Sequence, residues 1–97
     1  MAGYIVLGKW TQQGMATIKT WSERIKGVYA AAEKAGINVV GTWVTMGEYD
    51  TIAIFDAPDE QTMTTFVLNV VKSGNVTTQT LRALSEEEFA QVVSKLP

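Results

Sequence analysis

Residues 37–56 have the sequence INVVGTWVTMGEYDTIAIFD, which is two strand-like runs joined by a short polar turn. Both runs are rich in β-branched and aromatic residues, and in the second Ile52 and Ile54 alternate with their neighbours. Gly47 offers the positive φ that a tight turn needs. Two runs joined by a glycine-containing turn of this length predict a β-hairpin, with strands over 37–46 and 50–56.

The segments around the hairpin alternate between helical and strand-like patterns. A β-branched and aromatic run predicts a strand over 4–10, and apolar spacings of three, four or seven predict either one bent helix or two helices over 11–35, ended by Gly36. Pro58 and two acidic residues open a second helix that Gly74 ends, and a further strand is expected over 75–84. The capping-box sequence 85–88 predicts a short C-terminal helix. We expect this helix to pack inward through its apolar residues, which are Phe89, Val92, Val93 and Leu96.

This order of elements predicts one ferredoxin-like α+β sandwich spanning residues 1–97, with strand order fourth, first, third, second. Strand alternation divides the sheet residues into two sets. We expect the first set to face the helices: Ile5, Leu7, Ile52, Ile54, Leu81 and Ala83. The second set is then expected to face away: Tyr4, Val6, Trp10, Trp43, Thr45, Ala53, Phe55, Thr78, Thr80 and Arg82. A face with so many apolar residues needs cover, so the sequence predicts a homodimer or higher homo-oligomer whose sheets enclose a partly polar cavity.

Composition excludes several classes of function. The chain has no histidine and no cysteine, which removes the usual transition-metal sites, Ser-His triads and thiol nucleophiles, and we predict no metal and no cofactor. A net charge of −2 without clustered Lys or Arg argues against nucleic acid and anionic membrane as partners. The N-terminal residues lack a signal-peptide pattern and no apolar run is long enough to span a membrane, so we expect a cytoplasmic protein.

The hairpin turn collects the reactive side chains. Asp50 could act as a base or bond the local backbone, and Tyr49 could donate to a ligand oxyanion or pack over the cavity. Arg82 needs an anion, supplied by a carboxylate of this chain, by a partner chain or by an acidic ligand. We therefore predict Asp50 and Tyr49 as catalytic candidates. The predicted ligand-binding residues are Trp10, Trp43, Thr45, Thr80 and Arg82.

Several segments resemble one known family. The stretch 43–50, followed by 57–59, 73–76 and 80–83, is similar to the GYD-domain family, named for its Gly-x-Tyr-Asp turn. The resemblance covers nearly the whole chain, from Tyr4 to Leu96. It implies a relative of the dimeric α+β barrels, a superfamily that includes cofactor-free monooxygenases, haem-degrading enzymes, stress-response barrels and amino-acid-sensing domains, so it implies a fold and leaves the activity open.

Two functions remain open from the sequence. The first is a homo-oligomeric module that binds a small organic ligand in the cavity between its sheets or serves in assembly. The alternative is a cofactor-free enzyme of the monooxygenase or isomerase type, acting on a small aromatic or polyketide-like substrate. In the enzyme, Tyr49 and Asp50 would be acid and base and Arg82 would stabilise negative charge.

Overall fold

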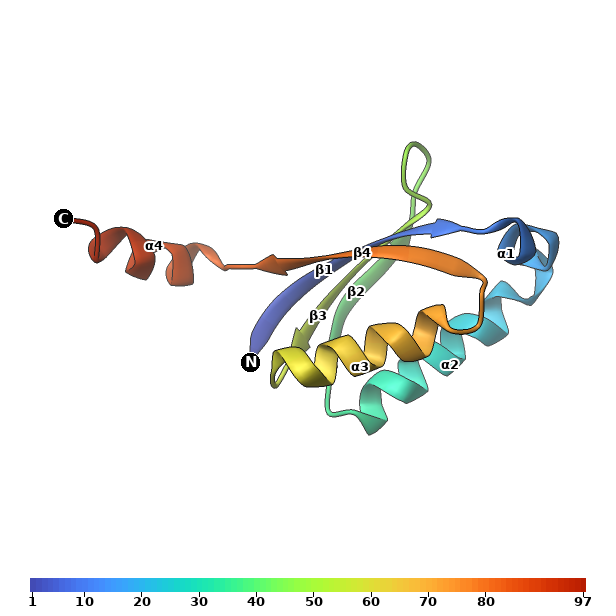
Figure 1. Ribbon diagram of the computed structural model, residues 1–97, viewed down its shortest axis with the longest axis horizontal. Helices are drawn as coiled ribbons and strands as arrows, with labels where there is room; N and C mark the ends of the chain where they lie inside the picture. The colour runs from blue at the N-terminus through green and yellow to red at the C-terminus, as the bar shows by residue number, and fades with distance from the viewer.

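The computed structural model describes residues 1–97 and confirms the predicted α+β fold. Four antiparallel strands form one sheet in the order β2-β3-β1-β4, and Figure 1 shows α2 and α3 together on one face of it. No helix is long and apolar enough to cross a membrane. The elements in chain order are β1 (Ala2–Trp10), α1 (Gln12–Ala16), a 3₁₀ turn (Ile18–Thr20), α2 (Trp21–Lys34), β2 (Asn38–Val44), β3 (Thr51–Ala57), α3 (Glu60–Val71), β4 (Val76–Ala83) and α4 (Glu86–Ser94).

The helix boundaries follow local chemistry. The interval predicted as one bent helix or two divides at Thr17 into α1 and α2, joined by the 3₁₀ turn. Gly36 ends α2 with φ of 74°, the left-handed conformation that glycine adopts without strain. Asp59 caps α3, since its carboxylate accepts a hydrogen bond of 2.7 Å from the backbone N–H of Thr62. That hydrogen bond, together with those from the Thr62 side chain and the Gln61 N–H, lowers the pKa of Asp59.

The prediction of which sheet face meets the helices was wrong. Tyr4 and Phe55 are buried, and Phe55 packs edge-on against Phe66 of α3 with ring centroids 5.2 Å apart. Cross-strand partners share a face, so Arg82, which pairs with Tyr4, lies on the helix side as well. The other set forms an uncovered surface, which we call the open face: Ile5, Leu7, Trp43, Ile52, Ile54, Leu81 and Ala83. Both sets are apolar, and alternation alone does not say which one the helices cover.

A β-bulge explains why Trp43 keeps its predicted side. The pairing of β2 with β3 shifts between Val39 and Gly41, so Val39 lies opposite Phe55 whereas Trp43 lies opposite Ile52. The extra residue reverses the alternation, and side chains beyond it change face. Trp43 then covers Gly41, where an added Cβ would meet its ring at 2.5 Å. Thr42 turns toward the helices and its hydroxyl lies 2.6 Å from that of Tyr29 on α2.

Large side chains fill only one end of the space between the sheet and the helices. The buried cluster lies around the start of β1, the end of β3, the end of α2 and the first half of α3. Its members are Tyr4, Ala32, Ile37, Phe55, Ala57, Met63 and Phe66. In the next layer of the sheet the facing residues are Val6 and Ala53, and there the core opens into a hollow.

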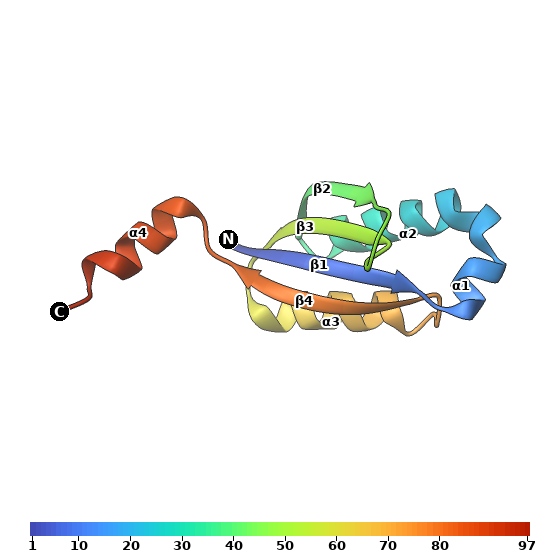
Figure 2. The same ribbon diagram turned by 90° about the horizontal axis from the view of Figure 1, so that it is seen from above.

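The C-terminal helix α4 does not pack inward, so that expectation was wrong. Figures 1 and 2 show it extending beyond the end of the sheet, and its apolar residues Phe89, Val92, Val93 and Leu96 are exposed. The extension gives the chain a length of 53 Å and a radius of gyration of 14.8 Å, compared with about 13 Å for a compact domain of 100 residues. Local capping therefore forms this helix without any support from the core of its own chain.

Candidate functional site

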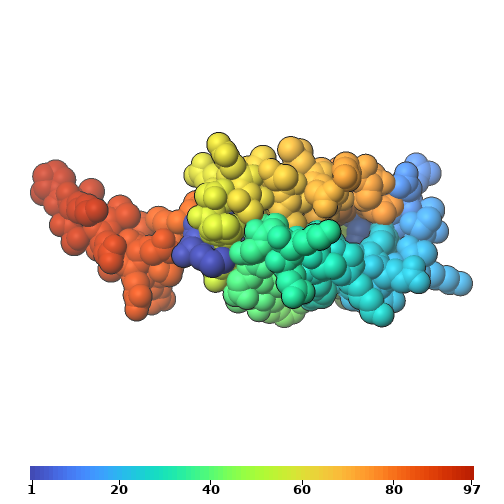
Figure 3. All heavy atoms as spheres, turned by 90° about the horizontal axis from the view of Figure 1, so that it is seen from below, coloured from blue at the N-terminus to red at the C-terminus, as the bar shows by residue number.

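The hollow between the sheet and the helices is a partly open cavity of about 480 Å³. Its floor is the helix side of β1 and β3, and its walls are α2 and α3. Figure 3 shows the molecule from the helix side, where α2 in green and cyan lies beside α3 in yellow and orange. Most of its 22 lining residues are hydrophobic. This is the size and the lining that small-molecule sites show.

Small residues explain why the cavity exists. Val6 and Ala53 are cross-strand partners on the floor, where Tyr4 and Phe55 fill the corresponding layer at the other end of the sheet. On α2, a stripe at spacings of three and four borders the cavity, and it consists of Arg24, Gly27, Val28 and Ala31. A Cβ added at Gly27 would meet nothing within 4 Å, although glycine inside a helix costs about 0.5–1 kcal/mol relative to alanine. The sequence therefore places no side chain at this position of α2, and the cavity is not filled there.

Arg24 is the one ionisable side chain that borders the cavity. Its Nη2 donates to the backbone oxygens of Gly14 at 3.1 Å and Thr17 at 3.4 Å, so the guanidinium is held against the end of α1. Its Nε is buried and has no hydrogen-bond partner. The sequence analysis did not single out Arg24. The sequence did carry one signal for it, because Arg24 is a cation within a helical stripe whose other members, Gly27, Val28 and Ala31, are small or apolar.

Asp50, a predicted catalytic residue, holds the hairpin to β1. Its Oδ2 accepts from the backbone N–H of Trp10 at 2.9 Å, and its own N–H donates to the Gly8 oxygen at 2.8 Å. Its carbonyl oxygen accepts from the N–H of Thr45 at 2.7 Å. The carboxylate therefore bonds the backbone of β1, not the backbone of its own turn, and it is not among the groups that border the cavity.

Tyr49, the second catalytic candidate, reaches across β1 to β4. Its hydroxyl donates to Oε1 of Gln79 at 2.9 Å, and the ammonium of Lys9 lies 5.2 Å from its ring centroid. Thr45 donates to the Tyr49 carbonyl oxygen at 2.6 Å and so stabilises the turn. Gln79 and Lys9 follow the alternation of Leu7, so Tyr49 lies on the open-face side of the sheet.

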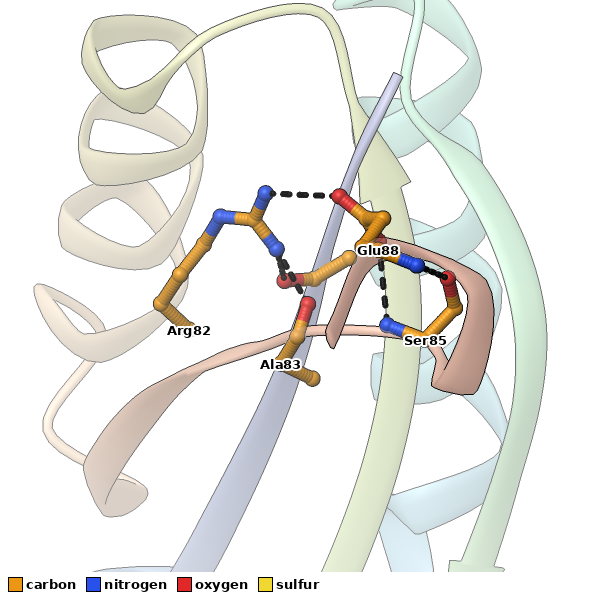
Figure 4. A network of polar contacts seen from close by, with 5 residues as sticks. Arg82, Ala83, Ser85 and Glu88 are labelled. Atoms are coloured by element: carbon orange, nitrogen blue, oxygen red, sulfur yellow. Dashed lines mark hydrogen bonds and ion pairs between the residues drawn. The ribbon is translucent and has the colours of Figure 1, made fainter. Parts of the chain in front are cut away.

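Arg82 lies near the opposite end of the sheet from Asp50. Figure 4 shows its guanidinium donating to the Ala83 carbonyl oxygen and pairing with Glu88 of α4 at 3.4 Å. It also donates to the Gly3 oxygen and lies 5.6 Å from the Tyr4 ring centroid. Both residues contact β1, Asp50 at Trp10 and Arg82 at Gly3. These two positions on the strand are about 23 Å apart at 3.3 Å per residue. These two charges therefore do not form one site within the chain.

The network around Arg82 also fixes the start of α4. Glu88 accepts from the N–H of Ser85 while the Ser85 hydroxyl accepts from the N–H of Glu88, a complete capping box. The Ser85 N–H lowers the pKa of Glu88, and Arg82 adds to that effect. Because folding lowers the pKa of Glu88, its carboxylate contributes to the free energy of unfolding at pH values above the ordinary glutamate pKa. This contribution is lost as the pH falls through the lowered pKa of the folded chain.

Of the predicted ligand-binding residues, Trp10 and Trp43 are among those that border the cavity, although the Trp43 ring covers Gly41 on the open face. Thr45 bonds the hairpin, Arg82 bonds α4, and Thr80 is exposed on β4. Their roles toward a ligand, and the catalytic roles of Asp50 and Tyr49, stay predictions.

Replacing Asp50 by Ala should lower the free energy of unfolding by about 1–3 kcal/mol, because it leaves the partly buried Trp10 N–H without its acceptor. Asp50→Asn retains an acceptor oxygen and should lose less. Urea denaturation measures both variants. A native-like midpoint for Asp50→Ala would contradict the structural role given to this carboxylate.

Comparison with known proteins places the chain in a family. A family model described as the GYD domain matches residues 4–93. A protein of Thermus thermophilus, described as a glutamine synthetase and cystathionine beta-lyase binding protein, is 34% identical over 85 residues, covering 87% of this chain and 90% of that protein.

Two solved structures share the fold. One is 5-chloro-2-hydroxyhydroquinone dehydrochlorinase from Burkholderia phenoliruptrix, in complex with 2,5-dihydroxybenzoquinone, with TM-score 0.60, 18% identity and coverage of 90% of this chain and 97% of that one. The other is an ACT domain protein from Streptococcus pneumoniae, with TM-score 0.51, 16% identity and coverage of 86% and 90%. At such identities the likeness concerns the fold alone. The family model, in contrast, spans nearly the whole sequence, and the chain belongs to the GYD domain family, as its turn sequence predicted.

Proposed function

We propose that this protein is a non-catalytic binding module that holds a small, mainly apolar molecule in the cavity between its sheet and its helices. The observation that carries the proposal is the cavity itself, about 480 Å³ in volume, mainly apolar, and continuous with the core. The inter-sheet cavity expected from the sequence would be a separate space on the open face, and it stays a prediction.

Ligand binding in this cavity has a clear physical driving force. The lining side chains of Val6, Val28 and Val70 border empty space where a well-packed core would give them neighbours. A ligand that buries about 150 Å² of apolar surface there would gain roughly 4 kcal/mol at 25 cal/mol per Å², before the entropic costs of binding. Tryptophans 10 and 21 offer flat surfaces on which a planar ring can pack.

The groups around the cavity favour binding over catalysis. Acid–base chemistry needs a proton donor or acceptor within hydrogen-bond reach of the reacting atoms. The one charged lining group is an arginine, whose guanidinium offers N–H donors and no acceptor for a proton. Asp50 and Tyr49, the acid–base pair of the enzyme alternative, are engaged by Trp10 and Gln79. The dehydrochlorinase shares the fold at 18% identity, which lends no support to that activity here.

We further propose that the module works as a homo-oligomer. The open face carries Ile5, Leu7 and Ile54 without cover, and α4 exposes a second apolar surface that its own chain does not reach. Two copies that pack their open faces together would bury the first of these surfaces, and α4 could contact the partner. The description of the Thermus thermophilus relative as a binding protein for two enzymes supports a role in protein association as well.

A substitution at Gly27 tests the proposed function. Two probes of the same shape, 2-naphthoate and the neutral 2-naphthamide, can be titrated by calorimetry. Gly27→Trp should place an indole at the cavity wall, where an added Cβ would meet nothing within 4 Å, and weaken probe binding at least about tenfold. Gly27→Ala is the control. It should keep probe binding and raise stability by about 0.5–1 kcal/mol.

A loss of probe binding can be told apart from a loss of folding, because neither variant removes a side-chain contact of the native chain. Native-like probe affinity in Gly27→Trp would show that the probes bind elsewhere. No binding of either probe to the native protein would remove the support for a ligand cavity.

A further inference from the structure

Arg24 has a position unlike that of any other cation in this chain. It projects from the α2 stripe that borders the cavity, and the one ion pair of the structure joins two other residues, Arg82 and Glu88. No carboxylate therefore neutralises Arg24. Its Nε is buried without an acceptor, while its Nη2 is fixed by the backbone oxygens of Gly14 and Thr17.

A guanidinium held in this way is ready to bind an anion. It has five N–H donors in a rigid planar arrangement, and its hydrogen bonds within the chain use Nη2 alone. Because the two backbone contacts fix the group, little side-chain entropy is lost when a ligand binds. The surrounding apolar lining lowers the effective dielectric constant, which strengthens the attraction to a negative charge.

Two polar residues that border the cavity, Ser73 and Asn75, are uncharged and make hydrogen bonds within the chain. Ser73 donates its hydroxyl proton to the Val70 oxygen at 3.0 Å, and Oδ1 of Asn75 accepts from Nε2 of Gln13 at 3.0 Å. Arg24 is therefore the charged group available to a ligand in this cavity. Trp10 and Trp21 also border the cavity.

We infer that the cavity binds a small apolar carboxylic acid, whose hydrocarbon body fills the hollow and whose carboxylate pairs with the guanidinium of Arg24. The inference rests on the proposed function and adds the chemical class of the ligand. An aromatic acid fits best, because its planar ring can pack against the tryptophans while its carboxylate matches the guanidinium.

Calorimetric titration of the native protein with 2-naphthoate and with 2-naphthamide tests this choice of ligand. The acid should bind about tenfold more tightly or better, since hydrogen bonds to charged groups are stronger than neutral ones. Arg24→Met should bring the affinity for the acid down to that for the amide, and Arg24→Lys should retain part of the difference. Circular dichroism checks that each variant is folded.

Lys26→Met is the matched control, because it removes one positive charge from the exposed side of the same helix. It should leave the preference for the acid unchanged. Equal affinity of the native protein for acid and amide would overturn the role of Arg24 while leaving the cavity as a binding site. An equal loss in Lys26→Met and Arg24→Met would also overturn it, because net charge would then explain the preference. Binding of neither probe would overturn this inference together with the proposed function. The comparison on the native protein stands even if Arg24→Met does not fold.

Discussion

Leu81→Lys should convert the assembled protein into a folded monomer. Leu81 is 39% exposed in the single chain and lies on the open face, opposite Ile5. A lysine there is solvated in the monomer, but between two packed sheets it would be a buried charge without a partner, which costs about 3–5 kcal/mol. Association should weaken more than 100-fold, because each 1.4 kcal/mol is a factor of ten.

Leu68→Lys provides the matched control for this experiment. Leu68 is 61% exposed on α3, on the opposite side of the molecule from the open face, so the same change of residue should leave assembly intact. Analytical ultracentrifugation at micromolar concentration measures both variants. A native protein that sediments as a monomer, or a Leu81→Lys variant that assembles like the native protein, would contradict the proposed packing of open faces.

Phe66→Ala should lower the free energy of unfolding by about 3–5 kcal/mol, the largest stability effect that we expect from a single substitution. Phe66 is 5% exposed and packs edge-on against Phe55, so it joins α3 to the sheet. It also borders the cavity, and its removal would extend the hollow into the filled end of the core. In a domain with a stability of 5–15 kcal/mol this is a large fraction.

Leu68→Ala is the comparison on the same helix. Its side chain is exposed, and we expect a change within about 0.5 kcal/mol. Urea denaturation of the two variants, carried out at equal protein concentration, gives the difference directly. Similar losses for Phe66→Ala and Leu68→Ala would show that α3 is not held to the sheet through Phe66.

The sequence predicted the fold well because local signals agreed with one another. The glycine-containing turn, the glycine that ends α2 and the capping box at Ser85 each have a physical cause that lies within a few residues. It was harder to predict which face of the sheet the helices cover. Both alternating sets are apolar, and the bulge after Val39, which moves Trp43 to the open face, depends on pairing with a distant strand.

The candidate site was harder to predict from the sequence. A cavity forms where small residues on several helices and strands meet, and the sequence does not show which of them meet. Gly27 and Ala53 are ordinary small residues until α2 is placed over β3, and the lack of a carboxylate partner for Arg24 is visible only in the structure. The reactive turn, in contrast, stood out in the sequence. The partner of Asp50, the backbone N–H of Trp10, lies on β1, 40 positions away in the sequence, so the turn alone does not reveal it.

Methyl NMR during a titration with 2-naphthoate tests the central claim most directly, because it distinguishes the cavity from the open face. The methyl groups of Ile25, Val28, Val67 and Val70 border the cavity, whereas those of Ile5, Leu7, Ile54 and Leu81 belong to the open face. Ligand binding between the sheet and the helices predicts saturable shifts in the first group with the second group little changed. Shifts confined to the second group would place the ligand between sheets and contradict a binding site in the helix-side cavity.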